Sequence, residues 1–375
     1  MRIAYVYVGG GLDRTVGITR KLADQISVWR ARGHEVRLFI QAYTPDGASS
    51  AVLERAGIRV ERFIDRRIDS AVSWGAMRQR LGTISRLVSA VEEWRPTLAY
   101  ARFTMSYPPL VRMARQLPLA LEINTDDVAE YRGQLPWYKY LYHRLTRGNL
   151  LRAATGLVYT TPELAGYPHL AVPRARSVVI PNGVNLDQPL PPRAAARARP
   201  RVLFLGEPGF PWHGTDKVLA LARRCPDWDF DLVGPEAADL GQRPIPENVR
   251  PHGYLPAERY LGIAAEADVA LGTLALHRKH MNEACPLKVR EYLACGLPTV
   301  IAYRDVDFTH GAWFLLELPN TPDNVAAGLG EIRAFVQRVR GQRVPREAIA
   351  HLDFRRKEAA RLDFFEQVLS NGRRP

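Results

Sequence analysis

The chain has 375 residues, of which 46% are hydrophobic and 24% charged, so it is neither a disordered nor a fibrous chain. Its length predicts two domains, or three. No apolar run approaches the roughly 20 residues of a membrane-spanning helix. The apolar stretch after Met1 is too short for the core of a signal peptide, and no small-residue cleavage site follows it. We therefore expect a cytoplasmic protein.

Cysteine content and charge further restrict the class of protein and the kinds of partner that the sequence predicts. The three cysteines, Cys225, Cys285 and Cys295, are an odd number without C-x-x-C spacing, which argues against a disulfide framework or a structural zinc site. The net charge is +13, and residues 1–187 carry 26 basic and 16 acidic side chains. This excess favours an anionic partner, such as a nucleic acid, a phospholipid surface or a phosphate-bearing substrate. A general preference for arginine is the alternative explanation.

The first half of the chain alternates short apolar strands with amphipathic helices. Residues 2–8 predict a strand, which is followed by a glycine turn, a helix over 16–32 and a strand over 35–41. Further strands are predicted at 58–63, 97–102, 119–124, 156–160 and 177–180, with the longest helix at 70–94.

The alternation restarts after a proline-rich linker at 188–200. Strands are predicted at 201–205, 228–233, 248–252, 268–271 and 298–302, with a helix at 215–224. A charged helix over 346–369, within a last segment of 346–375, either completes the second domain or crosses back to the first. Repeated strand–helix units imply parallel sheets covered on both faces. We expect two doubly wound α/β domains, 1–187 and 201–345, facing across a cleft.

Two strand-to-helix turns could hold an anion. Gly9, Gly10 and Gly11 follow the first strand, where glycine allows close backbone approach and the next helix offers N–H groups. The run is not G-x-G-x-x-G, and no acidic residue ends the second strand, so a dinucleotide site is disfavoured and a plain turn is the alternative. The turn over 206–214 carries His213, which can donate to a phosphate oxygen or simply belong to a folded loop.

The segment 281–301 is the richest in candidate chemistry. Pro286 suits the first turn of a helix and Gly296 its C-terminal cap, so Glu283 precedes the helix and Glu291 lies within it. Lys288 lies three residues before Glu291, on adjoining parts of one face. These side chains either form a surface ion pair beside a solvated Glu283, or converge on an anionic ligand that bears hydroxyl groups.

The Glu283-x7-Glu291 pattern, with its Pro-Leu-Lys and Glu-Tyr-Leu-Ala-x-Gly-Leu-Pro context, resembles the signature of retaining glycosyltransferases of family 4. Gly33-His34-Glu35-Val36, Pro181-Asn182-Gly183-Val184-Asn185 and Trp212-His213-Gly214-x2-Lys217 extend the resemblance over nearly the whole chain. It implies a GT-B fold of two Rossmann-like domains. It also implies metal-independent, retaining transfer of a sugar from a nucleotide-diphosphate donor to an acceptor hydroxyl, in polysaccharide or glycoconjugate synthesis.

The resemblance also implies roles for particular residues. Glu291 would bind the ribose hydroxyls, Glu283 would contact the donor sugar near the reacting centre, and Lys288 would neutralise the diphosphate. The implied donor-binding set is Gly10, Gly11, His213, Gly214, Lys217, Ala284, Cys285, Pro286, Leu287, Lys288 and Glu291.

The chain departs from the family pattern at two places. His213 stands where the family usually has a lysine, and the expected arginine of that turn is missing, so His213, Lys217, Lys288 and Arg278 are all candidates for the phosphate contact. The family histidine after a middle strand is also absent. Asn124, Asp126 or Asp127 could face a substrate there, with Asp126 as a catalytic candidate, or the two aspartates only cap the next helix.

Asp305 and Asp307, one residue apart, are typical of a metal site in another glycosyltransferase fold. In GT-B enzymes helix dipoles and basic side chains take that role, so we expect neither a metal nor a cofactor.

Two other functions stay open at this point. One is a GT-B sugar epimerase or glycoside phosphorylase, and the other is a non-catalytic binder of nucleotide sugars or nucleic acid. No nucleic-acid-reading motif appears, so we expect no nucleic-acid partner. The basic residues of 62–86 favour a lipid-linked glycan acceptor and a peripheral position on the inner face of a membrane.

Overall fold

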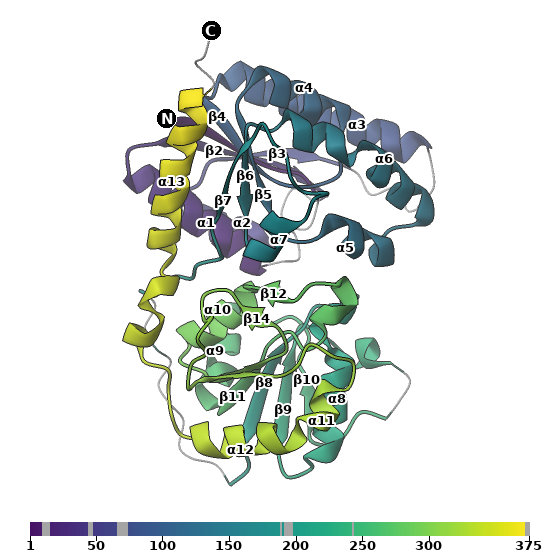
Figure 1. Cartoon of the computed structure of the whole chain (residues 1–375), viewed down its shortest axis with the longest axis vertical. Coiled ribbons are helices and arrows are strands. Elements are labelled where there is room, and N and C mark those ends of the chain that lie inside the picture. Colours follow the sequence, from purple (N-terminus) through teal and green to yellow (C-terminus); the bar gives the residue numbers. More distant parts are fainter. Residues whose placement is uncertain are drawn as a thin grey trace. The chain divides into compact units, whose positions relative to one another are not determined.

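The computed structural model describes residues 1–9, 16–43, 48–65, 74–187, 190, 198–241 and 244–371. The chain forms two compact units, the first made of Met1–Pro181 with Phe354–Pro375 and the second of Asn182–Asp353. Each unit has a parallel sheet with helices packed on it (Figure 1). The prediction of two doubly wound α/β domains is therefore confirmed.

The sheet of the first unit has seven parallel strands in the order β3-β2-β1-β4-β5-β6-β7. Its strand order reverses between β1 and β4, which is where ligands bind in doubly wound folds. The predicted strands are all present, with ends shifted by one or two residues. They are β1 (Arg2–Tyr7), β2 (Glu35–Ala42), β3 (Val60–Ile64), β4 (Leu98–Arg102), β5 (Leu119–Ile123), β6 (Gly156–Tyr159) and β7 (Arg176–Val179).

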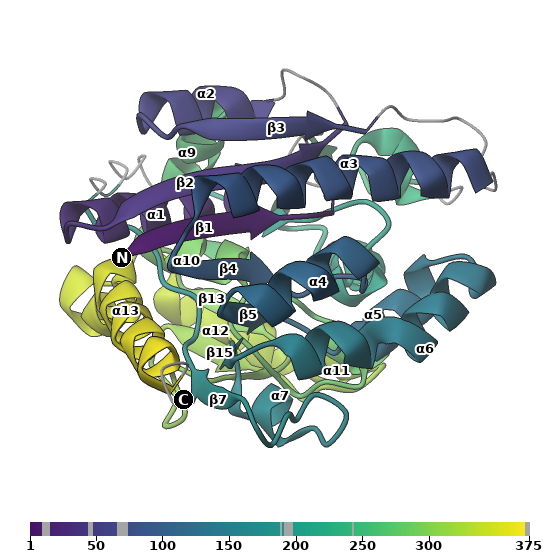
Figure 2. The same cartoon turned by 90° about the horizontal axis from the view of Figure 1, so that it is seen from above.

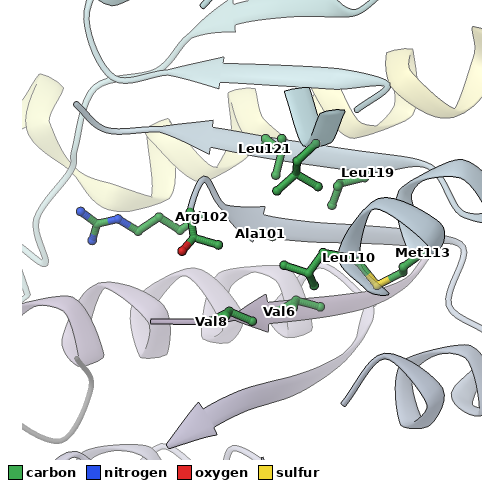
Figure 3. Close-up of a pocket in the computed structure, with 10 residues that line it drawn as sticks. Val6, Val8, Ala101, Arg102, Leu110, Met113, Leu119 and Leu121 are labelled. Atoms are coloured by element: carbon green, nitrogen blue, oxygen red, sulfur yellow. The ribbon is translucent and has the colours of Figure 1, made fainter. Parts of the chain in front are cut away.

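Helices cover both faces of this sheet because its strands alternate apolar side chains on both sides. Tyr5 of β1 packs in a core cluster with residues of α1 and α13, whereas Val6 faces α4 (Figure 3). Helices α3, α4 and α6 lie side by side on the second face (Figure 2). The helices are α1 (Val16–Ala31), α2 (Ala48–Arg55), α3 (Trp74–Trp94), α4 (Pro108–Gln116), α5 (Asp127–Gln134), α6 (Trp137–Ala153), α7 (Pro162–Gly166) and α13 (Phe354–Asn371).

The single helix predicted over 346–369 is wrong, because two elements occupy that range. A 3-10 helix, η4 (Arg346–Leu352), belongs to the second unit, and α13 belongs to the first. Asp353 between them has φ −54° and ψ 124°, which is not helical and interrupts the run.

Buried polar contacts hold α13 in the first unit. The Glu358 carboxylate accepts hydrogen bonds from Trp29 Nε1 at 2.9 Å and Gln25 Nε2 at 3.1 Å. Arg361 donates to Glu358 at 2.9 Å and pairs with Glu122 of β5 at 3.4 Å. Since all these groups are buried, the loss of one leaves the others without a partner.

We expect Glu358→Ala to lower the free energy of unfolding of the first unit by about 3–5 kcal/mol, because it leaves the buried Arg361 undercompensated. Glu366→Ala, an exposed position on the same helix, should change it by less than about 0.5 kcal/mol. Denaturant unfolding followed by tryptophan fluorescence measures both. Equal effects would contradict the role given to Glu358.

The main sheet of the second unit has six parallel strands in the order β10-β9-β8-β11-β13-β15, with the reversal between β8 and β11. The strands are β8 (Arg201–Leu205), β9 (Asp229–Val233), β10 (Val249–Pro251), β11 (Val269–Leu271), β13 (Thr299–Ile301) and β15 (Leu315–Glu317). A separate pair joins β12 (Glu283–Ala284) to β14 (Arg304–Asp305). The helices are α8 (Thr215–Arg224), α9 (Ala257–Glu266), α10 (Leu287–Ala294), α11 (Asn324–Ala327) and α12 (Leu329–Val339), with short 3-10 turns η1 (Pro211–His213), η2 (Ala237–Leu240) and η3 (Leu276–Lys279).

Several sequence predictions fall wholly or partly outside the described residues, among them the basic segment 62–86 and the helix at 70–94, because 66–73 are not described. Of the linker at 188–200, only 190 and 198–200 are described, and Gly10 and Gly11 are not described at all. Within the described part of the chain, no helix is long and apolar enough to cross a membrane.

Candidate functional site

The candidate site lies in the second unit, where the strand order reverses between β8 and β11. The turn after β8 contains η1, and the segment after β11 contains η3. Backbone hydrogen bonds join the two, from Leu274 N to His213 O and from Ala275 N to Trp212 O, both at 3.2 Å. Gly214 has φ +80°, and an added Cβ there would lie 3.0 Å from Leu274. Glycine therefore suits this close contact.

His213 of the β8 turn is a neutral hydrogen-bond donor. Its Nδ1 accepts a hydrogen bond from the backbone N–H of Glu207 at 3.0 Å. Burial, together with the nearby charges of Lys288 and Lys279, holds the pKa of His213 well below its usual value. A neutral ring that accepts at Nδ1 carries its proton on Nε2. This histidine can therefore donate to an anion without being charged.

Lys288 of α10 reaches the same turn. Its Nζ donates to the carbonyl oxygen of Leu205, at the end of β8, at 3.0 Å and lies 4.9 Å from the ring centre of Phe204. Burial lowers the pKa of Lys288 to about 7. An anion bound here would favour the charged form and raise that pKa again.

The structure separates the candidates for the phosphate contact. Lys217 donates to Thr321 O at 2.7 Å and to Asn324 Oδ1 at 2.8 Å, and Arg278 makes two hydrogen bonds to Asp216, at 2.9 and 2.7 Å. Both side chains are therefore engaged by protein partners, whereas His213 and Lys288 lie together.

Lys279 of η3 joins these two residues, and the sequence analysis did not identify it. Its Nζ lies 4.4 Å from the ring centre of Trp212, and its charge contributes to lowering the pKa of His213. The sequence does hold a signal for Lys279. Four consecutive basic or imidazole residues, 277–280, follow β11, which is a strand of the switch point.

The strand that carries Glu283 is anchored by a buried arginine. Arg290 is fully buried and makes two hydrogen bonds to Asp305, at 2.7 and 2.8 Å. It donates also to Asp307 at 2.8 Å and, through Nε, to the carbonyl oxygen of Asn182 at 3.1 Å. The two aspartates thus share a protein cation. Because β14, which contains Asp305, pairs with β12, Arg290 fixes the position of Glu283.

Glu283 itself is mostly buried. Its side chain is 16% exposed, and its carboxylate lies 3.7 Å from Arg304, which is 63% exposed. Arg304 lines a polar hollow of about 380 Å³ together with Asn282, Tyr303, Glu317, Leu318, Pro319 and Asn320. Glu283 therefore lies next to a hollow lined by groups that can bind hydroxyls.

The segment Ala284–Leu287 joins β12 to α10. Asn182 Nδ2 donates to the carbonyl oxygen of Cys285 at 2.8 Å, and the Asn182 N–H points to Cys285 Sγ at 3.4 Å. Pro286 is the N-cap of α10, one residue earlier than predicted, and Gly296 has φ +75° after its last turn, as expected. Glu291 lies one turn beyond Lys288 and is partly exposed, like Lys288.

The cysteines are structural in character. All three are free and buried. Burial raises the pKa of both Cys285 and Cys295 to about 11, so these thiols stay protonated and poorly nucleophilic.

In the first unit, Asp126 and Asp127 have structural partners. Asp126 caps α5 by accepting from the N–H groups of Val128 and Ala129, at 3.0 and 3.3 Å. Asp127 pairs with Arg147 through both oxygens, at 2.6 and 2.7 Å. Among the described residues, one group of potential metal ligands lies within 4.8 Å, namely Asp126, Asp127 and His169. Its oxygens already accept these hydrogen bonds.

Asn124 and the neighbouring cavity offer no stronger candidate. The Asn124 amide lies 3.4 Å from the carbonyl oxygen of Glu122. Val6, Val8, Leu110 and Met113 are among the residues that line an apolar cavity of about 10 Å³, and the Arg102 guanidinium extends away from them (Figure 3). That volume holds about one water molecule, not a sugar.

Comparison with known proteins concerns the family and the fold. A family model described as "Glycosyl transferase 4-like domain" matches residues 16–183. Residues 16–183 are therefore similar to a glycosyl transferase 4-like domain. No curated protein matches the chain in sequence.

Solved structures show the fold of the whole chain. Sucrose-phosphate synthase from Thermosynechococcus elongatus has a TM-score of 0.71 at 14% identity, covering 99% of this chain and 100% of that one. Anabaena Alr3699/HepE, solved with UDP and glucose, has a TM-score of 0.65 at 18% identity, covering 99% of each chain. The UDP-GlcNAc 2-epimerase of Neisseria meningitidis has a TM-score of 0.56 at 11% identity, covering 98% of this chain and 100% of that one. The chain therefore has a GT-B fold.

Lys288→Met should stabilise the second unit by at least about 1 kcal/mol below neutral pH, because it removes a cation whose burial is costly. The pKa of a lysine is ordinarily 10.5, and that of Lys288 in the folded chain is about 7. Between pH 7 and 10.5 the unfolded chain therefore binds more protons than the folded chain. Wild-type stability should consequently rise with pH over this window, and the variant should lack that rise.

Thermal unfolding across this pH range measures the effect, with Lys357→Met of the first unit as the control for general loss of charge. A variant less stable than the wild type at acidic pH would contradict the assignment.

Proposed function

We propose that this chain is a retaining glycosyltransferase that moves a sugar from a nucleotide-diphosphate donor to an acceptor hydroxyl. The observation that carries the proposal is the convergence of His213, Lys279 and Lys288 at the switch point of the second unit. Two lysine charges that lower the pKa of a neighbouring histidine create a positive potential, which favours a bound anion. HepE, which shares the fold, was solved with UDP, and this supports a nucleotide diphosphate as that anion.

Each end of the donor has a proposed partner in the second unit. Lys288, Lys279 and the Nε2–H of His213 bind the diphosphate, and Gly214 allows close backbone approach. Glu291, one helical turn from Lys288, binds the ribose hydroxyls. Glu283 and the backbone N–H groups of Ala284, Cys285 and Leu287 face the sugar, next to the polar hollow at Arg304.

The proposed chemistry is front-face substitution at the anomeric carbon. The bond from this carbon to the diphosphate oxygen breaks with both electrons on the leaving group. The acceptor oxygen bonds to the same face of the carbon, and its proton passes to the departing diphosphate. Protein groups stabilise the developing charges, and one such preorganised contact contributes about 3–4 kcal/mol. Basic side chains fill the role of a metal ion, so we propose that none is required.

For the acceptor, we propose only a chemical class. We assign its contacts to the first unit and its chemistry to a glycan or a lipid-linked glycan, as in polysaccharide or glycoconjugate synthesis. A cytoplasmic enzyme at the inner face of a membrane fits such an acceptor.

A second candidate function is epimerisation of a nucleotide sugar, favoured by the fold shared with the UDP-GlcNAc 2-epimerase. The two functions differ in their products. Incubation with the donor alone would return an epimerised nucleotide sugar in one case and only slow hydrolysis in the other.

The donor is found by a thermal-shift panel of UDP, GDP, ADP and their sugars. One of the nucleotides should stabilise the chain by about 2.7 kcal/mol at 100 times its dissociation constant. If none of them shifts the transition, the nucleotide part of the proposal is wrong.

With the donor known, Glu283→Ala should lower turnover by about 10²–10³-fold while nucleotide binding survives, since this carboxylate acts on the sugar. Glu291→Ala should instead weaken nucleotide binding itself, because it removes the ribose contact. Steady-state transfer assays and calorimetric titration separate the two effects.

Glu331→Ala, an exposed glutamate of α12, is the matched control and should leave both quantities unchanged. If Glu283→Ala and Glu291→Ala both turn over as fast as the wild type, the roles proposed for these two glutamates are wrong.

A further inference from the structure

Helix α6 of the first unit carries apolar residues on two opposite faces. Leu150 and Leu151 are buried on one face, whereas Trp137, Leu141 and Leu145 recur every four residues on the other. A helix with two apolar rows can bury only one of them against a single sheet. The contacts of α6 determine which row is left over.

A buried ion pair makes that choice. His143 and Arg147, one turn apart, both contact the Asp127 carboxylate, at 2.5 and 2.6 Å. Arg147 also donates to the carbonyl oxygen of His169 at 2.7 Å. Because these side chains must face inward, the row of Trp137, Leu141 and Leu145 is turned outward.

The outward row is strongly exposed. Trp137 is 77% exposed, Leu141 48% and Leu145 75%. The other exposed large apolar residues of the described chain, Val179, Leu190, Tyr254 and Trp313, are scattered over separate segments. The row on α6 is about 12 Å long at 1.5 Å per residue. Aligned exposed apolar residues of this kind mark an interaction surface.

Positive charge borders the row. Arg144 and Arg152 are exposed on the same helix, and α6 contains no acidic residue. The Arg152 guanidinium folds back over Gly148, with Nη1 2.6 Å from where a Cβ would stand, and Nη2 donates to Asn149 at 3.0 Å. Gly148 thus leaves room for a cation beside the apolar row.

We propose that α6 docks the chain on an anionic membrane surface, with Trp137, Leu141 and Leu145 in the interfacial layer and Arg144 and Arg152 at the lipid phosphates. Tryptophan and leucine flanked by arginine are typical of helices that lie in this layer. A second copy of the chain fits the face less well, since a two-fold contact would bring the arginines of both copies together. Neighbouring α3 and α4 lie in the same layer of helices (Figure 2).

This inference adds a defined surface to the membrane contact expected from 62–86, which stays a prediction. It does not depend on the proposed reaction, because vesicle binding and sugar transfer are measured separately. Either one can fail while the other stands.

The test is flotation of the full chain with vesicles of phosphatidylcholine alone or mixed with phosphatidylglycerol. The wild type should bind the mixed vesicles at low salt. Trp137→Ser/Leu141→Ser/Leu145→Ser should weaken binding at least about a hundredfold, because three apolar side chains no longer leave water. Arg144→Gln/Arg152→Gln should weaken binding to the mixed vesicles by about twenty- to thirtyfold.

Two controls keep the result specific. Trp313→Ala and Arg223→Gln/Arg224→Gln change exposed residues of the second unit and should bind vesicles like the wild type. Circular dichroism should show unchanged folding in all variants. The proposal is overturned if the wild type does not float with the mixed vesicles, or if the serine variant floats equally well. It is also overturned if sedimentation velocity shows a wild-type dimer that the serine variant loses, while vesicle binding does not change.

Discussion

The arrangement of the site in the second unit depends on one buried guanidinium, that of Arg290. It joins the start of the unit at Asn182, helix α10 and the Asp305–Asp307 segment, and each of these carries or positions a candidate site residue. A fully buried cation needs every one of its partners, so the position of the Glu283 strand is closely restricted. The aspartates that resemble a metal site by sequence are the partners that this arginine requires.

A second constraint comes from the basic residues His213, Lys279 and Lys288 at the switch point. At the switch point, burial lowers the pKa of Lys288, and burial with the charges of Lys288 and Lys279 lowers the pKa of His213, so the ligand-free site carries a cost in stability. Lys288, with a pKa of about 7, can gain or lose its proton as the ligand arrives or departs. A donor diphosphate would offset this cost. A polar site of this kind favours ligand binding while it lowers the free energy of unfolding of the ligand-free chain.

The sequence predicted the regular parts of the fold well because strands such as β1 and β8 are continuous apolar runs next to strong helix signals. It missed β15. It read 346–369 as one helix because the sequence pattern there does not reveal the non-helical backbone angles of Asp353. At the site, local spacing and the family resemblance made Glu283, Glu291, His213 and Lys288 candidates, and their roles stay predictions. Arg290 was missed because its importance comes from contacts between segments distant in sequence, which no local pattern records. Lys279 was missed although it lies in the basic run at 277–280.

The most direct test of the central claim is the number of protons taken up when a nucleotide-diphosphate sugar binds. Calorimetric titration in buffers of different ionisation enthalpy, at a pH just above the pKa of Lys288, measures this number. The account predicts that the wild type takes up a proton, because the diphosphate raises that pKa, and that Lys288→Met takes up none. Tight binding with no proton uptake by the wild type, or with equal uptake by both chains, would contradict it.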